Sequence, residues 1–404
     1  MHDQDAPYRP FEGIRVLDLG QVYQAPYATF LMAQAGAEVI KVEPFEGEPV
    51  RMRIRVGAGA GLPLALLNGD KQGMTLNLKA ESGRNLLMEL VKHVDVLVEN
   101  FRPGVMERLG LSADVLREAN PRLIYGAASG YGQEGPSKDK AAMDITIQAA
   151  SGLMSATGFP DGPPVKSGPA IVDFLSGTHL FGAIAAALYQ RQISGVGATI
   201  DIAMLDTAIP ALTSNLGAYF GPRPPAVDRT GNHHGGYAVA PYNVYALKDG
   251  YLAIICINDG HWRSLCDAMG QPELADDPRF KDNACRSRNM SETDGVVEAW
   301  SCELTMEEAL ALGQEFSFPC APVRTIDDVV HDPHLWERGM WHKQTHPDMG
   351  EITVLGSPLR FNGQASTAPG PAPGLGEHNE QILRQLLGLD DDEIEQLRQD
   401  GAIT

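Results

Sequence analysis

The chain has 404 residues, of which 43% are hydrophobic and 21% are charged, a composition typical of a soluble globular protein with room for two domains. Its formal net charge of −20 argues against nucleic acid and anionic membranes as partners, because either needs a basic face. We see no signal segment and no apolar run near 18 residues. Five cysteines, an odd number, lie between Cys256 and Cys320 without metal-type spacing, which is typical of reduced thiols. These features predict a soluble cytoplasmic protein with no membrane partner and no metal site.

Strand-like and helix-like segments alternate through the first 203 residues. Short apolar runs predict strands at 14–18, 38–42, 74–78, 95–100, 122–126 and 199–203. Helical spacing predicts helices at 26–35, 81–93 (capped by Ser82), 105–109, 112–120, 144–157 and 178–189. This rhythm predicts an α/β, Rossmann-like, mostly parallel sheet covered on both faces. The turn after the first strand, residues 20–25, lacks the three-glycine dinucleotide fingerprint, so NAD is not expected.

The pattern changes after residues 221–225, a proline-rich segment that reads as a linker. Residues 242–256 predict a hairpin that turns at 248–250. Helices are expected at 261–269, 294–302 and 306–315, then an extended segment at 355–361, a stiff spacer at 369–373, and helices at 380–387 and 391–399. We therefore expect a large domain built from both chain ends, residues 1–220 and 336–404, and a smaller α+β domain at 226–335.

Asp173 lies in the most informative stretch of the chain, residues 166–179. It follows the apolar run 170–172 and precedes a small-residue helix expected to begin at Thr178. A carboxylate there would meet backbone N–H groups and the positive end of the helix dipole, which would keep it ionised at the open end of an α/β sheet. The local pattern fits a catalytic carboxylate, but it also fits an ordinary N-cap, since helix starts favour aspartate.

Several segments, in order over nearly the whole chain, resemble the class III acyl-CoA transferases, a family that also includes α-methylacyl-CoA racemases and carnitine-type CoA transferases. The segments that carry the resemblance are 13–18 with 25–26, 36–43, 98–104 with 108–110, Asp144 with 151–154 and 157–158, the Asp173 stretch, 231–232 with 240–242, 319–323, 331–333 and 374–378. The resemblance implies CoA transfer from an acyl-CoA to a small carboxylic acid, with Asp173 as the nucleophile that forms a covalent aspartyl intermediate. It also implies an interlocked homodimer.

By position, the resemblance assigns coenzyme A contacts to residues of the first half of the chain. They are Tyr23, Gln24 and Ala25 in the first turn, Leu76 and Lys79 for adenine and phosphate, and Asn100, Phe101 and Arg108 for pantetheine and diphosphate, with Arg102 as a further cation. Pro44 stands where the family often has an arginine. Residues 51–55, which alternate like a strand, are candidates to supply that charge, although they also fit an ordinary basic face.

The racemase branch of the family is the main alternative. It uses a histidine directly before Asp144 as one of two bases, and here Met143 stands there as an apolar wall of the site. His179 and His233 could substitute, but His179 reads as a packed or hydrogen-bonded residue. A non-catalytic CoA-binding protein and a CoA-linked lyase or hydratase are further alternatives. Oxyanion donors are expected near Gly177 or, less well supported, in the loop 233–236.

Overall fold

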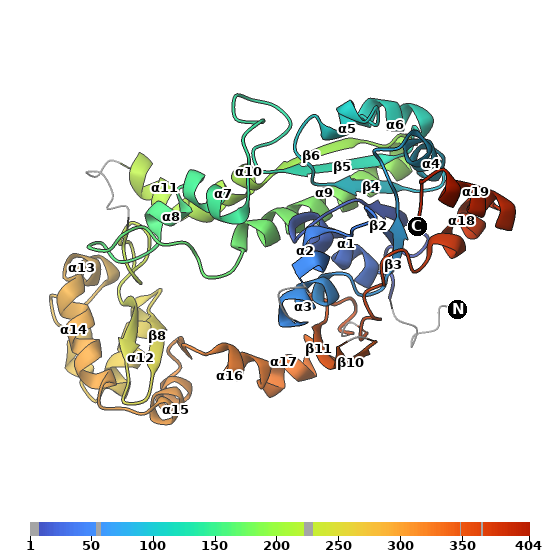
Figure 1. Cartoon of the computed structure of the whole chain (residues 1–404). Coiled ribbons are helices and arrows are strands. Elements are labelled where there is room, and N and C mark those ends of the chain that lie inside the picture. Colours follow the sequence, from blue (N-terminus) through green and yellow to red (C-terminus); the bar gives the residue numbers. More distant parts are fainter. Residues whose placement is uncertain (1–7, 54–57, 222–228, 348, 365–366) are drawn as a thin grey trace. The chain divides into compact units, whose positions relative to one another are not determined.

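The computed structural model describes residues 8–53, 58–221, 229–347, 349–364 and 367–404 (Figure 1). These residues divide into two compact units. The large unit contains the chain up to Ile147, Gly168–Ala208 and the chain from Val330 onward, and the small unit contains Gln148–Ser167 and Ile209–Val329. Most of the predicted linker at 221–225 lies outside the described residues.

A parallel sheet forms the centre of the large unit. Among the described residues it has six strands in the order β3-β2-β1-β4-β5-β6, and each neighbouring pair is parallel. The strands are β1 (Arg15–Asp18), β2 (Glu38–Glu43), β3 (Lys71–Thr75), β4 (Val96–Glu99), β5 (Ile124–Ser129) and β6 (Thr199–Ala203). The order reverses between β1 and β4, so their carboxyl ends form the kind of crevice that binds ligands in doubly wound folds. The predicted α/β fold class is confirmed.

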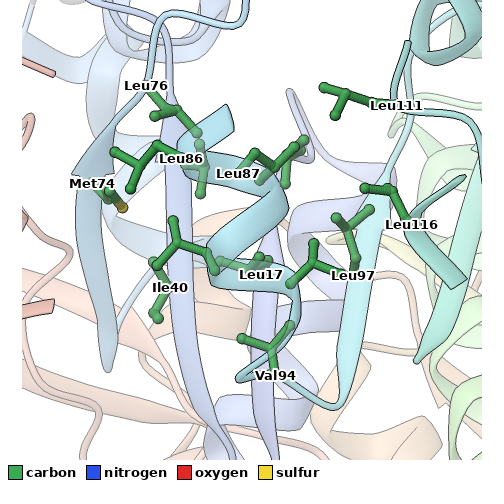
Figure 2. Packing of buried hydrophobic residues seen from close by; sticks show 14 of the residues in the cluster. Leu17, Ile40, Met74, Leu76, Leu86, Leu87, Val94, Leu97, Leu111 and Leu116 are labelled. Carbon is green, nitrogen blue, oxygen red and sulfur yellow. The ribbon is translucent and has the colours of Figure 1, made fainter. Parts of the chain in front are cut away.

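Helices cover both faces of this sheet because its strands alternate between two apolar faces. Leu17 and Leu97 contribute to a core with Leu87 of α4, which Figure 2 shows, whereas their neighbours Val16 and Val96 contribute to a second core with α1 and α9. The helices of the large unit up to β6 are α1 (Gln24–Gln34), α2 (Pro49–Met52), α3 (Ala58–Leu67), α4 (Glu81–Val91), α5 (Val105–Arg108), α6 (Ala113–Ala119), α7 (Asp144–Ala150, at the unit boundary) and α9 (Ile171–Ser194). α10 (Met204–Ala208) follows β6.

The C-terminal segment from Val330 onward belongs to the large unit. α17 (Pro333–Glu337) leads to an antiparallel hairpin of β10 (Trp341–His346) and β11 (Gly350–Leu355), a hairpin that was not predicted from the sequence. α18 (Asn379–Leu387) and α19 (Asp391–Gln399) then pack beside β3 and α4. Asn379 ties them to the sheet, since its Oδ1 accepts the N–H of Thr75 at 2.9 Å. The large unit is therefore built from both chain ends.

Helix α9 differs most from the sequence prediction. It begins at Ile171, seven residues before Thr178, and continues to Ser194. An 18-residue window within it has a mean hydropathy of 1.6, so the expectation of no apolar run near 18 residues was wrong. One helix of this composition is weak evidence for a membrane span, because core helices pass the same test. α9 packs along α1, β5 and β6 and carries buried polar residues, including Asp173 and Arg191.

The small unit has its own sheet and its own core. Its described strands β7 (Tyr242–Ala246), β8 (Tyr251–Ile255) and β9 (Cys320–Pro322) are antiparallel, and β7 and β8 form the predicted hairpin. Its helices are α8 (Leu153–Ala156), α11 (Thr213–Phe220), α12 (Asp259–Ala268), α13 (Asn283–Arg288), α14 (Met290–Ser301), α15 (Met306–Phe316) and α16 (Ile326–Val330), with 3-10 turns at Ile209–Leu212 and Pro272–Ala275. The core surrounds the fully buried Trp262. This unit has strands and helices, as expected for the domain predicted at 226–335, but it also contains Gln148–Ser167 and begins at Ile209.

Candidate active site

Asp173 lies in the first turn of α9, not in a loop before the helix. The residue is buried, with 9% of its surface exposed. The N-terminus of α9 is capped by another carboxylate: Oδ1 of Asp144 accepts the N–H of Val172 at 2.9 Å and the N–H of Asp173 at 3.4 Å. Asp144 therefore caps α9, and Asp173 is not the N-cap that its local sequence also allowed.

The environment of Asp173 changes its pKa. Burial, and after it the neighbouring Asp144 carboxylate, raise the pKa of Asp173 to about 7. The expectation that the helix start keeps Asp173 fully ionised was therefore wrong, because desolvation and a like charge outweigh the helix dipole. A carboxyl that titrates near neutral pH inside a protein is a typical functional-site candidate.

Residues next to Asp173 bring α9 against the turn that follows β1. The ring of Phe174 stacks on Tyr23 at 6.0 Å between centroids and meets Tyr27 edge-on at 4.9 Å. At Gly177 a Cβ atom would lie 2.6 Å from the carbonyl oxygen of Gln24, so glycine allows the close approach of α9 and α1. Because Gly177 lies inside the helix, its N–H faces the carbonyl four residues earlier, and it does not serve as the expected oxyanion donor.

Asn100 holds the turn after β1 from the neighbouring strand β4. Its Oδ1 accepts the N–H of Gln21 at 2.8 Å, and its Nδ2 donates to the Gln21 carbonyl at 2.9 Å. The turn leads directly into α1, where Gln24 and Ala25 are buried and Tyr23 is half-buried. Four of the residues predicted to contact CoA are thus brought together at the reversal point of the sheet.

A cavity of about 540 Å³ lies at the carboxyl ends of β1 to β4, within the usual size range of ligand sites. Three predicted CoA contacts, Leu76, Lys79 and Phe101, line it. The other lining residues are Leu19, Gln21, Val42, Glu43, Pro44, Phe45, Glu46, Asn77, Leu78, Val105 and Leu109. Lys79 is exposed and could reach a phosphate at the mouth of this cavity.

The arginines predicted for CoA do not line this cavity. Arg102 lines a separate cavity of about 150 Å³ with Glu99, whose pKa burial raises to about 7. Arg108 is exposed on α5, and its guanidinium lies 3.1 Å from where a Cβ of Gly104 would be. Both remain surface cations beside the site.

The segment 51–55 was predicted as a strand-like source of positive charge. Its described part belongs to the helix α2 and the residue after it, while residues 54 and 55 lie outside the described residues. Arg51 forms a bidentate pair with Glu43 and is thus occupied. Arg53 instead donates to the Tyr23 hydroxyl at 3.0 Å and covers its ring, and it is a member of the segment predicted to supply positive charge.

Met143 and the histidines bear on the racemase alternative. Met143 is 55% exposed, directly before Asp144, and its thioether has no proton to exchange. His179 is exposed and its Nδ1 bonds to the Leu175 carbonyl at 2.8 Å, in agreement with a hydrogen-bonded residue. Among the described residues, no group of three or more His, Cys, Asp or Glu side chains is arranged to hold a metal.

The predicted glycine loop belongs to the small unit. His233 is fixed there, with Nε2 2.6 Å from Oδ2 of Asp294, which also accepts the Tyr245 hydroxyl through Oδ1 at 2.7 Å. At Gly236, which has a φ of +80°, a Cβ would meet the Cβ of Ala218 at 2.6 Å. The loop is therefore packed within its own unit, and the glycine there is needed for both its backbone conformation and its close contact.

The chain thus combines a doubly wound sheet, a ligand-sized cavity at the carboxyl ends of its strands and a buried carboxyl in the first turn of α9, the features of an α/β ligand-binding enzyme. Residues 11–379 match the model of CoA-transferase family III. The chain belongs to this family and is a class III CoA-transferase, as the resemblance in its sequence indicated.

Relatives and solved structures extend over nearly the whole chain. A succinyl-CoA–D-citramalate CoA-transferase of Chloroflexus aurantiacus is 37% identical, covering 97% of this chain and 98% of its own. A formyl-CoA:oxalate CoA-transferase of Streptomyces avermitilis is 35% identical (98% and 100%), and a succinyl-CoA:glutarate CoA-transferase of Mus musculus is 34% identical (98% and 90%). A CAIB/BAIF family protein from Brucella suis shares the fold with a TM-score of 0.80 and 32% identity, covering 94% of this chain and 100% of that one.

Proposed function

We propose that this CoA-transferase moves CoA from an acyl-CoA thioester to a free carboxylic acid through a covalent intermediate on Asp173. The observation that carries the proposal is the buried Asp173 carboxyl in the first turn of α9, with a pKa raised to about 7 by burial and Asp144. A carboxyl with a raised pKa is both ionisable and basic near neutral pH, which suits a nucleophile.

The reaction keeps the thioester bond energy without another energy source. The Asp173 carboxylate attacks the thioester carbonyl and forms a mixed anhydride, and CoA leaves as a thiolate. The thiolate then attacks the aspartyl carbonyl of the anhydride, which gives an aspartyl-CoA thioester and releases the first acid as a carboxylate. A second carboxylate repeats both exchanges in the reverse direction, so that acyl-CoA leaves and Asp173 returns to its free form.

The cavity at the carboxyl ends of β1 to β4 is the site we propose for the nucleotide end of CoA. Its apolar wall, which includes Leu76 and Phe101, suits the adenine and pantetheine groups, and Lys79 suits a phosphate. Tyr23 connects this region to Asp173, because its ring stacks on Phe174 of α9. Arg53, which bonds to Tyr23, is a second cation for the phosphates.

We propose dicarboxylic acids as the acids exchanged. The names of these relatives contain oxalate, glutarate, succinyl and citramalate groups, each derived from a dicarboxylic acid, and one name also contains a formyl group. We also propose that the enzyme is a cytoplasmic homodimer. The described part of the chain has five cysteines, all of them free, which fits a reducing compartment.

The test is a transfer assay with labelled CoA. Wild-type protein should transfer CoA from succinyl-CoA to a short dicarboxylate in a panel of mono- and dicarboxylates. Asp173→Asn should lower kcat by at least about a thousandfold, since it removes the nucleophile without changing the side-chain volume. Asp114→Asn, a change at an exposed residue in the first turn of α6, should leave kcat unchanged. Near-normal transfer by Asp173→Asn would contradict the proposal.

A further inference from the structure

The turn between β1 and α1 is held by buried side chains. Oδ1 of Asp18 accepts the N–H of Gly20 at 2.8 Å. Oε2 of Glu48 accepts the N–H of Val22 at 2.8 Å. Asn100 bonds both the N–H and the carbonyl of Gln21, the residue between Gly20 and Val22. Glu48 lies 26 residues along the chain, at the N-terminus of α2, and is 1% exposed. The Gly20 N–H is thus bonded from the end of β1 itself, while the Gln21 and Val22 groups have side-chain partners from other parts of the fold.

Val22 has a backbone conformation that valine rarely adopts. Its φ is +67°, in the left-handed region, where a β-branched side chain crowds the backbone. Such strain persists only where the surrounding structure holds it, and it is concentrated at functional sites. The residue that follows Val22 is Tyr23, the first of the predicted CoA contacts. The strain therefore lies directly beside the proposed site.

Lys41 fixes the Glu48 carboxylate and the turn together. Its Nζ lies 3.2 Å from Oε1 of Glu48 and donates to the carbonyl of Gly20 at 3.0 Å. Lys41 has no exposed side-chain surface. Burial alone would lower its pKa, but nearby carboxylates, led by Asp18, outweigh this and raise it, so the ammonium stays charged. The pair therefore holds the Gly20 carbonyl on one side and the Val22 N–H on the other.

The pair belongs to a balanced buried network. Two further ion pairs complete it: Lys71 with Asp18 at 2.9 Å and Arg51 with Glu43 at 2.7 Å. Oε1 of Glu43 also accepts the N–H of Glu48 at 3.0 Å. Each carboxylate thus has its own cation, and a buried carboxylate with this many fixed partners has little freedom to move. The network gives Glu48 a defined position against the turn.

We infer that Glu48, held by Lys41, is a positioning residue for CoA binding: it keeps Val22 in its left-handed conformation and so sets the direction of Tyr23 and Gln24. This inference rests on the CoA site proposed above. Glu48 itself does not line the cavity, so it acts on CoA through the turn.

The test compares CoA affinity, measured by calorimetry, with folding, measured by circular dichroism. Glu48→Ala should weaken CoA binding about tenfold, because the turn relaxes away from the binding conformation. Adding Val22→Gly should restore affinity to within about threefold of wild type, because glycine adopts a positive φ without strain. Glu48→Gln is the milder variant. Its amide oxygen can still accept the Val22 N–H, but the side chain no longer forms an ion pair with Lys41. This variant should fold even where Glu48→Ala does not, and its CoA affinity should lie between those of wild type and Glu48→Ala.

Arg191→Met is the matched control. It also breaks a buried ion pair, with Asp95 at 2.8 Å, but at the amino end of β4, and it should lower stability without changing CoA affinity. Glu48 variants that fold and bind CoA as wild type does, or that lose no more affinity than Arg191→Met, would overturn the inference. Wild-type protein without measurable CoA affinity would instead overturn the proposed CoA site, and the inference with it.

Discussion

Asp144 and Asp173 are two carboxylates at the start of one helix with different environments. Asp144 accepts backbone N–H groups of α9, whereas Asp173 is buried and has its pKa raised to about 7. Because the folded-state pKa of Asp173 lies above its ordinary value of 3.8, its contribution to stability is fully present below about pH 4 and is lost as the pH rises through 7. Reactivity has the opposite dependence, since only the ionised carboxyl attacks a thioester.

The Asp144→Asn variant separates these two roles. Its side-chain oxygen can still accept the N–H groups of Val172 and Asp173, but its negative charge is gone. We predict that kcat/KM for transfer rises with pH, with a midpoint near 7 in wild type and a lower midpoint in Asp144→Asn. An unchanged midpoint in this variant would show that burial alone sets the pKa of Asp173. Asp114→Asn is the control, and its pH profile should match that of wild type.

At the scale of elements, the sequence predicted the sheet better than it predicted α9. β1, β2, β4 and β6 lie within two residues of their predicted bounds, because short apolar runs between helical segments identify buried strands. β3 begins and ends three residues earlier than predicted, because its first residues, Lys71, Gln72 and Gly73, do not belong to the apolar run at 74–78. The start of α9 was missed because its cap, Asp144, comes from a segment distant in sequence.

The sequence predicted part of the candidate site, the residues at the ends of the strands, but not the contacts made by α2. Leu76, Lys79 and Phe101 share a cavity because the carboxyl ends of parallel strands meet at one edge. The pairing of Arg51 with Glu43 and the contact of Arg53 with Tyr23 depend on how α2 lies beside the turn. No spacing in the sequence shows that arrangement, and a helix of four residues has too little periodicity to be recognised.

The contact between α9 and α1 gives a prediction about two glycines of one helix. Gly177→Ala should lower the free energy of unfolding by about 1–3 kcal/mol, because the new Cβ would lie 2.6 Å from the Gln24 carbonyl oxygen. Gly182→Ala is the control, since its Cβ would meet nothing within 4 Å and alanine favours helix by up to about 1 kcal/mol. Urea denaturation of both variants checks this, and equal stability would contradict the close-contact role of Gly177.

At the scale of the whole molecule, the C-terminal half of α9 exposes several large apolar side chains. Tyr189 is 72% exposed, Ile193 67% and, just after the helix, Val196 51%. Exposed apolar patches of this kind mark interaction surfaces. We predict that the enzyme is a dimer whose interface includes this surface.

Light scattering coupled to size exclusion checks the dimer. Wild type should have twice the mass of one chain, and Ile193→Glu should shift it toward the monomer or aggregates. Val115→Glu, at another exposed apolar residue on α6, should remain dimeric. A monomeric wild type, or a dimer unaffected by Ile193→Glu, would contradict this interface.

The nucleophilic role of Asp173 is tested most directly by trapping the intermediate. Protein incubated with succinyl-CoA and then hydroxylamine should carry a hydroxamate on one residue, because hydroxylamine cleaves the aspartyl thioester. Peptide mass spectrometry should locate this change at Asp173 in wild type and should find none in Asp173→Asn. A hydroxamate at another residue, or none in a preparation that transfers CoA, would contradict the proposed covalent aspartyl intermediate.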